Sequence, residues 1–167
     1  MDARALSPSE ASTWTRLAAV LELLPSAIDH RLVESTGSTR FEFAVLDTLA
    51  TAEHERVRMT ALAAATNATL PRLSRVVTRL EADGVVIKAA CEGDGRAVNA
   101  QLTDLGRERL AASRADHVAA IRDLLLTALD DSEVTQLGAI SAKALTALDP
   151  DGRFAVTRAC ETGGDQH

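Results

Sequence analysis

The 167-residue sequence is poor in aromatic residues and has no long apolar run. Aromatic side chains make up 2% of the chain and tyrosine is absent, yet hydrophobic residues make up 46%. The apolar side chains are therefore mainly Leu, Val and Ala, which favours packed helices over a sheet-rich fold. No run approaches the roughly 18 apolar residues that span a membrane, so we expect neither a membrane protein nor a disordered chain.

Cysteine is scarce as well. Cys91 and Cys160 are not in a Cys-x-x-Cys pair, and no disulfide framework is indicated. The first ten residues lack the apolar segment of a secretory signal, so we expect a cytoplasmic protein.

Residue patterns typical of enzymes and metal sites are missing. The histidines are scattered rather than paired, which argues against a zinc site, and they lie at His30, His54, His117 and His167. The sequence has no phosphate-binding loop and no nucleophile or metalloprotease motif. We therefore expect no cofactor, no metal and no catalytic site.

Positive charge is in deficit, with one local exception. The formal net charge is -6, which argues mildly against nucleic acid as a partner. Between Thr66 and Leu80, however, the chain carries three arginines and no acidic residue. A phosphate backbone is sensitive to the protein face that it meets, so this basic segment is the strongest indication of function.

The N-terminal third predicts two helices. Ser7, Pro8 and Glu10 form a helix start, and the helix should run to about Val33 with a kink or break at Pro25. Gly37 is a stop signal. A second helix fits residues 40–50, where apolar residues recur at helical spacing.

The middle of the chain predicts a helix-turn-helix followed by a β-hairpin. A short extended piece at residues 57–60 precedes a short helix at 61–66, capped by Thr60. The turn "NAT" then leads to a longer helix that is capped by Thr69 and ends at Gly84. This order is helix-turn-helix geometry. Strands from Val85 and from Ala97 flank the turn "CEGDGR" and form a wing.

The C-terminal third predicts two further helices. Thr103 caps a helix from Asp104 to about Leu129, and Asp130 caps another that runs to Leu148. The first of them has too many apolar residues for a lone surface helix. We therefore expect a homodimer; the alternative is a larger core within one chain.

The basic helix has two distinct faces. A projection at about 100° per residue places the apolar residues Leu70, Leu73, Val77 and Leu80 on one side. The opposite side presents Pro71, Arg75 and Thr78, flanked by Arg72 and Arg79. Arginine can pair bidentately with guanine or clamp a phosphate, so this side fits the major groove of DNA. The alternative is a solvated basic face on an ordinary surface helix.

The wing carries a second candidate contact. Arg96 lies near the hairpin tip, where it can reach a narrow minor groove, and Asp94 can hold its side chain extended. The alternative is an ordinary polar turn.

In these motifs the chain resembles the MarR family of winged helix-turn-helix regulators. The resemblance rests on "RMTALAAATNATLPRLSRVVTRLEADGVV", then "DGR", then "QLTDLGRERL", in the family's order and spacing. It implies a mainly α fold with a small β-hairpin wing and with N- and C-terminal dimerisation helices. It assigns residues 1–36 and 104–148 to dimerisation, 37–103 to DNA binding and 149–167 to a tail.

The resemblance also implies partners and sites. A homodimer would bind a palindromic double-stranded operator, with Thr69, Pro71, Arg72 and Arg75 in the major groove and Arg96 in the minor groove. A pocket between the dimerisation helices and the winged part would bind a small aromatic or phenolic acid and release DNA.

Four residues are candidates for that pocket. Trp14 resembles the Trp that helps frame the ligand in the urate-responsive branch of the family. That branch has an Asp where this chain has Ala44, and Asp47 lies nearby, so urate itself is not expected. His30 and His117 lie on helices that could line the pocket, although surface histidines are the alternative.

Two other readings remain open. Cys91 in the wing could make the protein a redox-responsive regulator, or one that responds to another signal, although nothing beside it lowers its pKa. A winged helix can also bind protein, but it would then expose apolar residues, rather than arginines, on the recognition helix.

Overall fold

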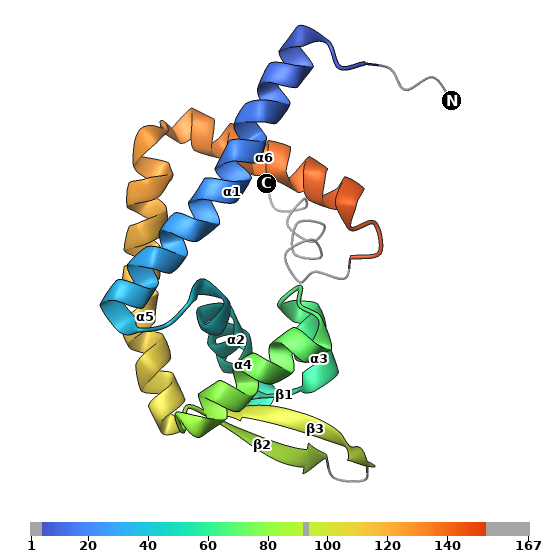
Figure 1. Cartoon of the computed structure of the whole chain (residues 1–167), viewed down its shortest axis with the longest axis vertical. Coiled ribbons are helices and arrows are strands. Elements are labelled where there is room, and N and C mark those ends of the chain that lie inside the picture. Colours follow the sequence, from blue (N-terminus) through green and yellow to red (C-terminus); the bar gives the residue numbers. More distant parts are fainter. Residues whose placement is uncertain (1–4, 92–93, 153–167) are drawn as a thin grey trace, which may run out of the picture.

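The computed structural model describes residues 5–91 and 94–152, with the backbone only for residues 91 and 94–97. The chain is mainly helical with a β-hairpin wing, as the sequence predicts, and a third strand extends the hairpin to a three-stranded sheet (Figure 1). In chain order the main elements are α1 Pro8–Thr36, α2 Arg40–Ala50, β1 Arg56–Arg58, α3 Met59–Ala65, α4 Leu70–Ala82, β2 Val86–Cys91, β3 Asp94–Leu102, α5 Asp104–Leu124 and α6 Asp131–Leu148. Within the described ranges, no helix is both long and apolar enough to cross a membrane.

Helix α1 begins and ends where the sequence predicts. The Ser7 hydroxyl accepts from the Glu10 N–H, and a Glu10 carboxylate oxygen accepts from the Ser7 N–H at 2.8 Å. Gly37 ends the helix with a φ of 68°, in the left-handed region that favours glycine. A kink or break is expected at Pro25, and the structure shows no break, because α1 continues through this residue. Packing of Leu24, Ile28 and the following turn against α5 on both sides of Pro25 keeps α1 in one piece.

Helices α2, α3 and α4 pack with the sheet to form the winged-helix part of the molecule. Its core consists of side chains such as Leu46, Leu62, Leu80 and Val86, all fully buried. Helix α3 begins at Met59, earlier than expected, and no side chain caps it, so Thr60 is not its cap. The helix-turn-helix prediction of residues 61–84 is otherwise confirmed.

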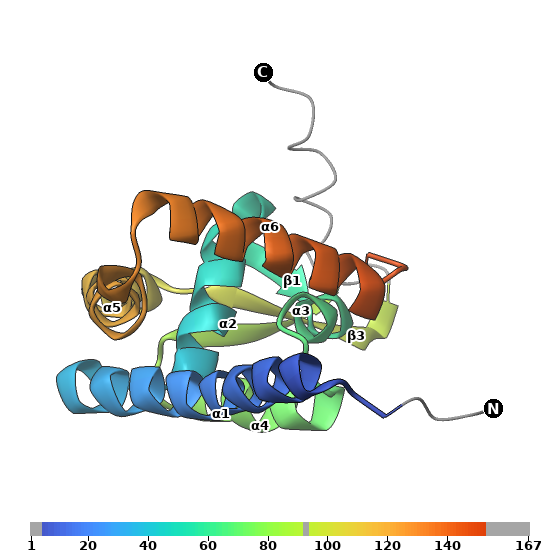
Figure 2. The ribbon, with the colours of Figure 1, turned by 90° about the horizontal axis from the view of Figure 1, so that it is seen from above.

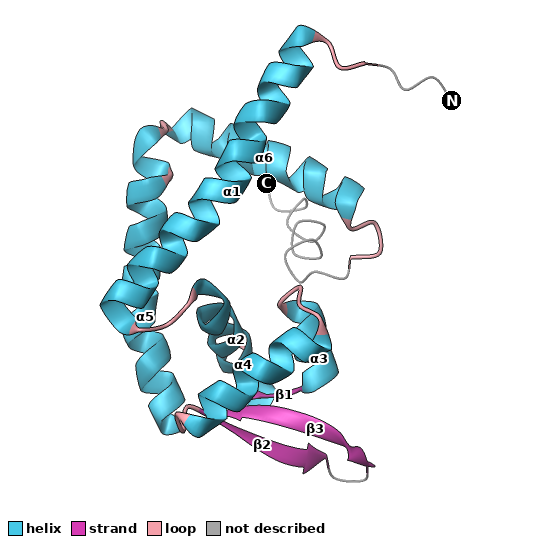
Figure 3. Cartoon of the chain, in the orientation of Figure 1, coloured by secondary structure: helices cyan, strands magenta, loops and turns pink. Residues whose placement is uncertain are grey.

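The sheet has the strand order β1-β3-β2 and is antiparallel throughout. The hairpin of β2 and β3 is the predicted wing. Strand β1 adds to its other side, with Val57 opposite Ala100. The sequence predicts an extended piece here but not its partner, because three residues are too short to carry a pairing pattern. Figure 3 shows the strands gathered at the end of the molecule away from α6.

Helix α5 links the winged-helix part to the helices at the other end. Its first turn lies against the start of the sheet, where a Cβ on Gly106 would come within 2.2 Å of the Val85 carbonyl oxygen. Farther along, Ala120 packs with Ile28 and Leu32 of α1, and Arg31 pairs with Asp123 at 2.8 Å. The helix ends at Leu124 rather than near Leu129, and a 3-10 turn follows at Leu126–Ala128.

Helix α6 is capped as predicted, by Asp130 with Glu133, but has no buried residue. It exposes the apolar side chains Val134, Leu137, Ile140 and Leu148. Helix α1 also exposes a row of large apolar side chains, at Trp14, Leu17, Val20, Leu21 and Leu23. Both helices lie at the end of the molecule away from the sheet (Figure 1), and seen from above α6 runs along the top and α1 along the bottom of the view (Figure 2). Their apolar faces are uncovered within a single chain.

Candidate nucleic-acid interface

Helix α4 is held in place by its apolar side. The Thr69 hydroxyl accepts from the Arg72 N–H at 3.4 Å and caps the helix as predicted. Leu73, Val77 and Leu80 are fully buried in the core. Leu70 was expected in the same stripe, but its side chain is 44% exposed. It is the first residue of the helix and lies at the edge of the packed region.

The opposite side of α4 is open to solvent. Every α4 residue that the sequence assigns to DNA binding is exposed, as is the capping residue: Thr69, Pro71, Arg72, Arg75, Thr78 and Arg79. The only basic residue in the last turn of the helix is Arg79, and its first turn has no acidic residue. The free N–H groups of the helix N-terminus add partial positive charge to this face.

The three arginines of α4 are held in different ways. The guanidinium carbon of Arg72 lies 4.3 Å from the centre of the Phe41 ring, within the range of a cation–π contact. Arg75 Nε donates to the Pro71 carbonyl oxygen at 3.4 Å. Within the part of the chain that the structure describes, neither has an acidic partner. Both guanidinium groups therefore keep donors for a phosphate or a base.

Arg79 differs because it forms an ion pair with Glu42 of α2. The Glu42 side chain is 1% exposed, whereas more than half of the Arg79 side chain is exposed. Helical periodicity places Arg79 on the DNA-facing side but does not reveal this carboxylate. The pattern "TRFE" was the available signal, because Thr39 followed three residues later by Glu42 is a capping box that fixes where the glutamate lies.

Lys88 of β2 is a basic residue of this region that sequence reasoning missed. Its Nζ donates to the Thr78 hydroxyl at 2.8 Å and lies 3.0 Å from a carboxylate oxygen of Glu81. The hydrogen bond from Lys88 lowers the pKa of Glu81, so this carboxylate stays ionised and paired. Lys88 lies in the apolar strand "VVIKA" rather than in the basic segment, so its sequence context does not connect it with α4.

The predicted wing contacts are only partly described. Asp94 and Arg96 lie in strand β3, and the backbone of Asp94 is opposite that of Cys91 in the hairpin. Their side chains, and that of Cys91, lie outside the described part, as do Cys160 and His167.

The residues assigned to the ligand pocket do not meet within one chain. Trp14 and His30 are on the same helix and about 24 Å apart along its axis. The Trp14 side chain is 58% exposed, and His30 pairs with Glu34 at 3.6 Å. Asp47 of α2 instead pairs with Arg114 of α5 at 2.6 Å.

The junction of α2 and α5 holds His117, which the sequence predicts either to line the ligand pocket or to lie on the surface. The His117 ring stacks on the Phe43 ring, with centroids 4.2 Å apart and an interplanar angle of 28°. Burial lowers the pKa of His117, and Arg40 acts in the same direction, while Asp47 opposes them. His117 is therefore a half-buried, neutral histidine near neutral pH rather than a surface one.

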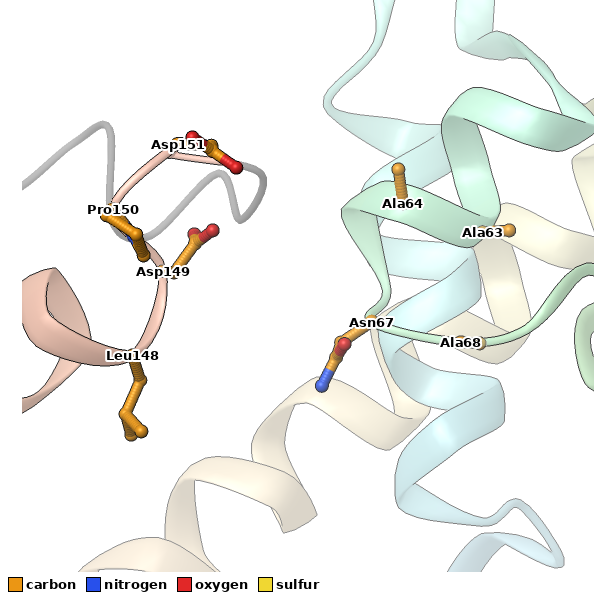
Figure 4. Close-up of a pocket in the computed structure, with 8 residues that line it drawn as sticks. All are labelled: Ala63, Ala64, Asn67, Ala68, Leu148, Asp149, Pro150 and Asp151. Atoms are coloured by element: carbon orange, nitrogen blue, oxygen red, sulfur yellow. The ribbon is translucent and has the colours of Figure 1, made fainter. Parts of the chain in front are cut away.

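A pocket of about 360 Å³ lies between the helix-turn-helix and the end of α6 (Figure 4). One wall consists of Ala63, Ala64, Asn67 and Ala68, and the other of residues 148–151. Residues 149–151 of this second wall belong to the predicted tail, but Asp149 is only 6% exposed, so the chain is packed at this point. The described residues that line this pocket include Asp149 and Asp151 and no basic residue, which does not fit an anionic ligand. Among the described residues, no group of three or more His, Cys, Asp or Glu side chains could hold a metal ion.

Comparisons with known proteins agree with this geometry. The family model described as "MarR family" matches residues 36–97, from the end of α1 into the wing. Sco3205, a MarR family transcriptional regulator of Streptomyces coelicolor solved in complex with DNA, is 32% identical, with 89% of this chain and 93% of that chain covered and a TM-score of 0.84. AbsC, another MarR family regulator of Streptomyces coelicolor, is 31% identical, with 90% and 98% covered and a TM-score of 0.78.

A more distant structure shares the fold. The organohalide-sensing RdhR-CbdbA1625 transcriptional regulator, solved in its 2,4-dichlorophenol-bound form, is 18% identical, with 92% of this chain and 89% of that chain covered and a TM-score of 0.70. A search of curated protein sequences found no significant match. The two Streptomyces relatives exceed 30% identity over nearly the whole of both chains. The chain therefore belongs to the MarR family of DNA-binding transcriptional regulators.

Proposed function

We propose that the protein is a homodimeric repressor that binds a palindromic DNA operator and is released from it by a small aromatic acid. The observation that carries the DNA-binding part is the outer face of α4. It offers Arg72 and Arg75 without an acidic partner among the described residues, on a helix whose other side is fixed in the core. A face of this kind fits duplex DNA better than an apolar protein partner.

In this proposal, α4 enters the major groove. Arg75 reads base edges together with Thr78 and Pro71, and Arg72 binds phosphate or the adjacent base. Thr69 caps α4, and the N-terminus of the helix would face the phosphate backbone of the DNA. The wing contributes Arg96, steadied by Asp94, to the minor groove. The DNA complex of the 32%-identical relative Sco3205 supports this use of the fold.

The dimer would be built by residues 1–36 and 104–148, with residues 37–103 as the DNA-binding unit and 149–167 as a tail. The uncovered apolar faces of α1 and α6 support this division, because so many large apolar side chains are rarely left in water by a stable monomer. Two α4 helices related by a two-fold axis would enter successive major grooves about 34 Å apart. A palindromic operator follows from that symmetry.

The ligand site would form at the junction of the dimerisation helices with the winged-helix part. Asp47 and its partner Arg114 lie at this junction in one chain. Trp14 and His30 of one subunit are too far apart on α1 to share one site. A site that contains both would take Trp14 from one subunit and His30 from the other. The relative that was solved with 2,4-dichlorophenol supports an aromatic ligand.

The test begins with an operator selected by the purified protein from a library of random DNA duplexes. Benzoate and 2,4-dichlorophenol are then titrated against the complex, with acetate as the non-aromatic control. We expect a palindromic selected site and release by an aromatic compound but not by acetate. A selected site without two-fold symmetry contradicts the dimer, and a complex that none of the compounds weakens contradicts release by these aromatic ligands.

A further inference from the structure

We propose that the first turn of α2 is a seat that sets the orientation of α4, with Glu42 and Phe41 as positioning residues for DNA reading. The inference assigns Arg79 to this seat rather than to a base or phosphate. It rests on the proposed use of α4 as the DNA-reading helix.

Glu42 is the central residue of the seat. One of its carboxylate oxygens accepts from the Thr39 N–H at 2.8 Å and from the Thr39 hydroxyl at 3.1 Å. The other oxygen binds Arg79. A buried carboxylate is stable only where hydrogen bonds and a cation satisfy it. Arg79 therefore stabilises the charge of Glu42, and Glu42 in turn fixes the orientation of the Arg79 side chain. At 1% exposure, Glu42 cannot itself touch DNA.

Phe41 forms the second contact of the seat. Its ring lies under the guanidinium group of Arg72. Arg72 and Arg79 are seven residues apart, which corresponds to two turns and about 10 Å along the axis of α4. Two contacts at this separation resist both rotation of α4 about its axis and sliding along it. Rotation of a reading helix redirects every side chain on its outer face, so base preference depends on the seat.

The seat is itself anchored to the long helices. An Asp29 carboxylate oxygen of α1 accepts from the Arg40 N–H at 2.5 Å. Arg109 of α5 donates to the Ser38 hydroxyl at 3.1 Å and pairs with Asp83, the residue that ends α4, at 2.9 Å. These contacts fix the orientation of α4 relative to α1 and α5, which belong to the proposed dimerisation region.

The experiment compares Glu42→Gln with Thr39→Ala, since both weaken the cap of α2 but only the first weakens the tie to Arg79. For each variant, affinity is measured for the duplex selected by the unmodified protein and for an unrelated duplex, over a range of salt. We expect Glu42→Gln to lower the ratio of specific to unrelated affinity by about tenfold, comparable to a mismatched base pair. Thr39→Ala should lower the melting temperature and leave the ratio unchanged. An unchanged ratio in Glu42→Gln overturns the proposal.

Arg79→Gln separates positioning from direct contact. A residue that clamps a phosphate contributes about one unit to the salt dependence of binding. In Arg79→Gln we expect the salt dependence to stay the same and the affinity ratio to fall. In the double variant Glu42→Gln, Arg79→Gln, two amides can hydrogen-bond without a buried charge, so the ratio should fall less than the sum of the single effects. A smaller salt dependence with an unchanged ratio would make Arg79 a phosphate contact and refute the seat.

A measurement without DNA keeps this inference distinct from the proposed function. In the free protein, Glu42→Gln should speed hydrogen exchange of the α4 amides more than Thr39→Ala does. Equal exchange in the two variants contradicts the seat. If the unmodified protein selects no duplex, the proposed function fails, and hydrogen exchange still decides whether α2 holds α4.

Discussion

Arginine side chains on one helix can have different roles, and their contacts within the protein distinguish them. Arg75 is held only by a hydrogen bond to the backbone of its own helix, so its guanidinium group keeps four N–H donors. Arg72 rests on an aromatic ring and Arg79 on a buried carboxylate. We therefore expect base reading to depend mainly on Arg75.

Replacing Arg75 with alanine should cost about 1–3 kcal/mol of binding free energy on the selected operator and relax base preference. Arg75→Lys is the matched control, because it keeps the charge and loses the planar fork of donors. It should preserve affinity for an unrelated duplex while losing specific affinity. Titrations on both duplexes measure the two effects. An equal loss of specific and unrelated affinity in Arg75→Ala would make Arg75 a phosphate clamp.

His117 should make the stability of the protein depend on pH. Because burial lowers its folded-state pKa below the usual 6.5, the unfolded chain binds more protons in this window. The stabilisation from neutral His117 is therefore complete above about pH 6.5, and the free energy of unfolding decreases as the pH falls toward the folded-state pKa. Chemical denaturation at pH 5 to 8 should show a shallower decrease for His117→Gln. The same pH dependence in the variant would contradict this assignment.

At the scale of whole elements, helix starts are the features that the sequence predicts best. Ser7, Thr69, Thr103 and Asp130 cap helices where expected, because capping is local chemistry within a few residues. Features set by distant packing could not be predicted in this way. The continuity of α1 through Pro25 depends on α5, and the pairing of β1 depends on β3.

The candidate site was predictable to the same extent. The outer face of α4 followed from helical periodicity, and all its assigned residues are exposed. The partners of Arg79 and Thr78 did not follow, because Glu42 lies 37 residues away and Lys88 lies on a different element. Periodicity reveals which residues share a face, but not which neighbour covers it.

The contact of α5 with the sheet gives a prediction at this scale. A Cβ on Gly106 would meet the Val85 carbonyl oxygen at 2.2 Å and a Leu102 side-chain carbon at 2.7 Å. Gly106→Ala should therefore destabilise the fold by about 1–3 kcal/mol, because backbone must move. Denaturant unfolding measures the loss, and an unaffected unfolding midpoint would contradict it.

Gly138→Ala is the matched comparison. In the single chain, a Cβ at Gly138 of α6 meets nothing within 4 Å. The substitution should stabilise the helix by about 0.5–1 kcal/mol. Destabilisation instead would indicate that a second subunit approaches α6 closely at this position.

For the whole molecule, the main question is what covers α6. Its exposed apolar residues lie within one arc of the helix, and Ile140 is 64% exposed. Ile140→Asp should convert the proposed dimer to a monomer and abolish tight operator binding, because a charge cannot be buried there without a partner. Thr135→Asp is the control, since Thr135 projects from the other side of α6 at about 100° per residue. Light scattering gives the mass of each variant. If Ile140→Asp and Thr135→Asp are both dimers, the dimer interface does not include Ile140.

Because α6 has no buried residue, the amount of active protein should depend on the concentration of the chain. If folding of that helix is completed only by a second copy, the active species forms by a bimolecular reaction, and its amount in dilute solution rises with the square of the chain concentration. Halving synthesis would then remove more than half of the dimers. DNA binding by this protein would then change more steeply than its expression level does.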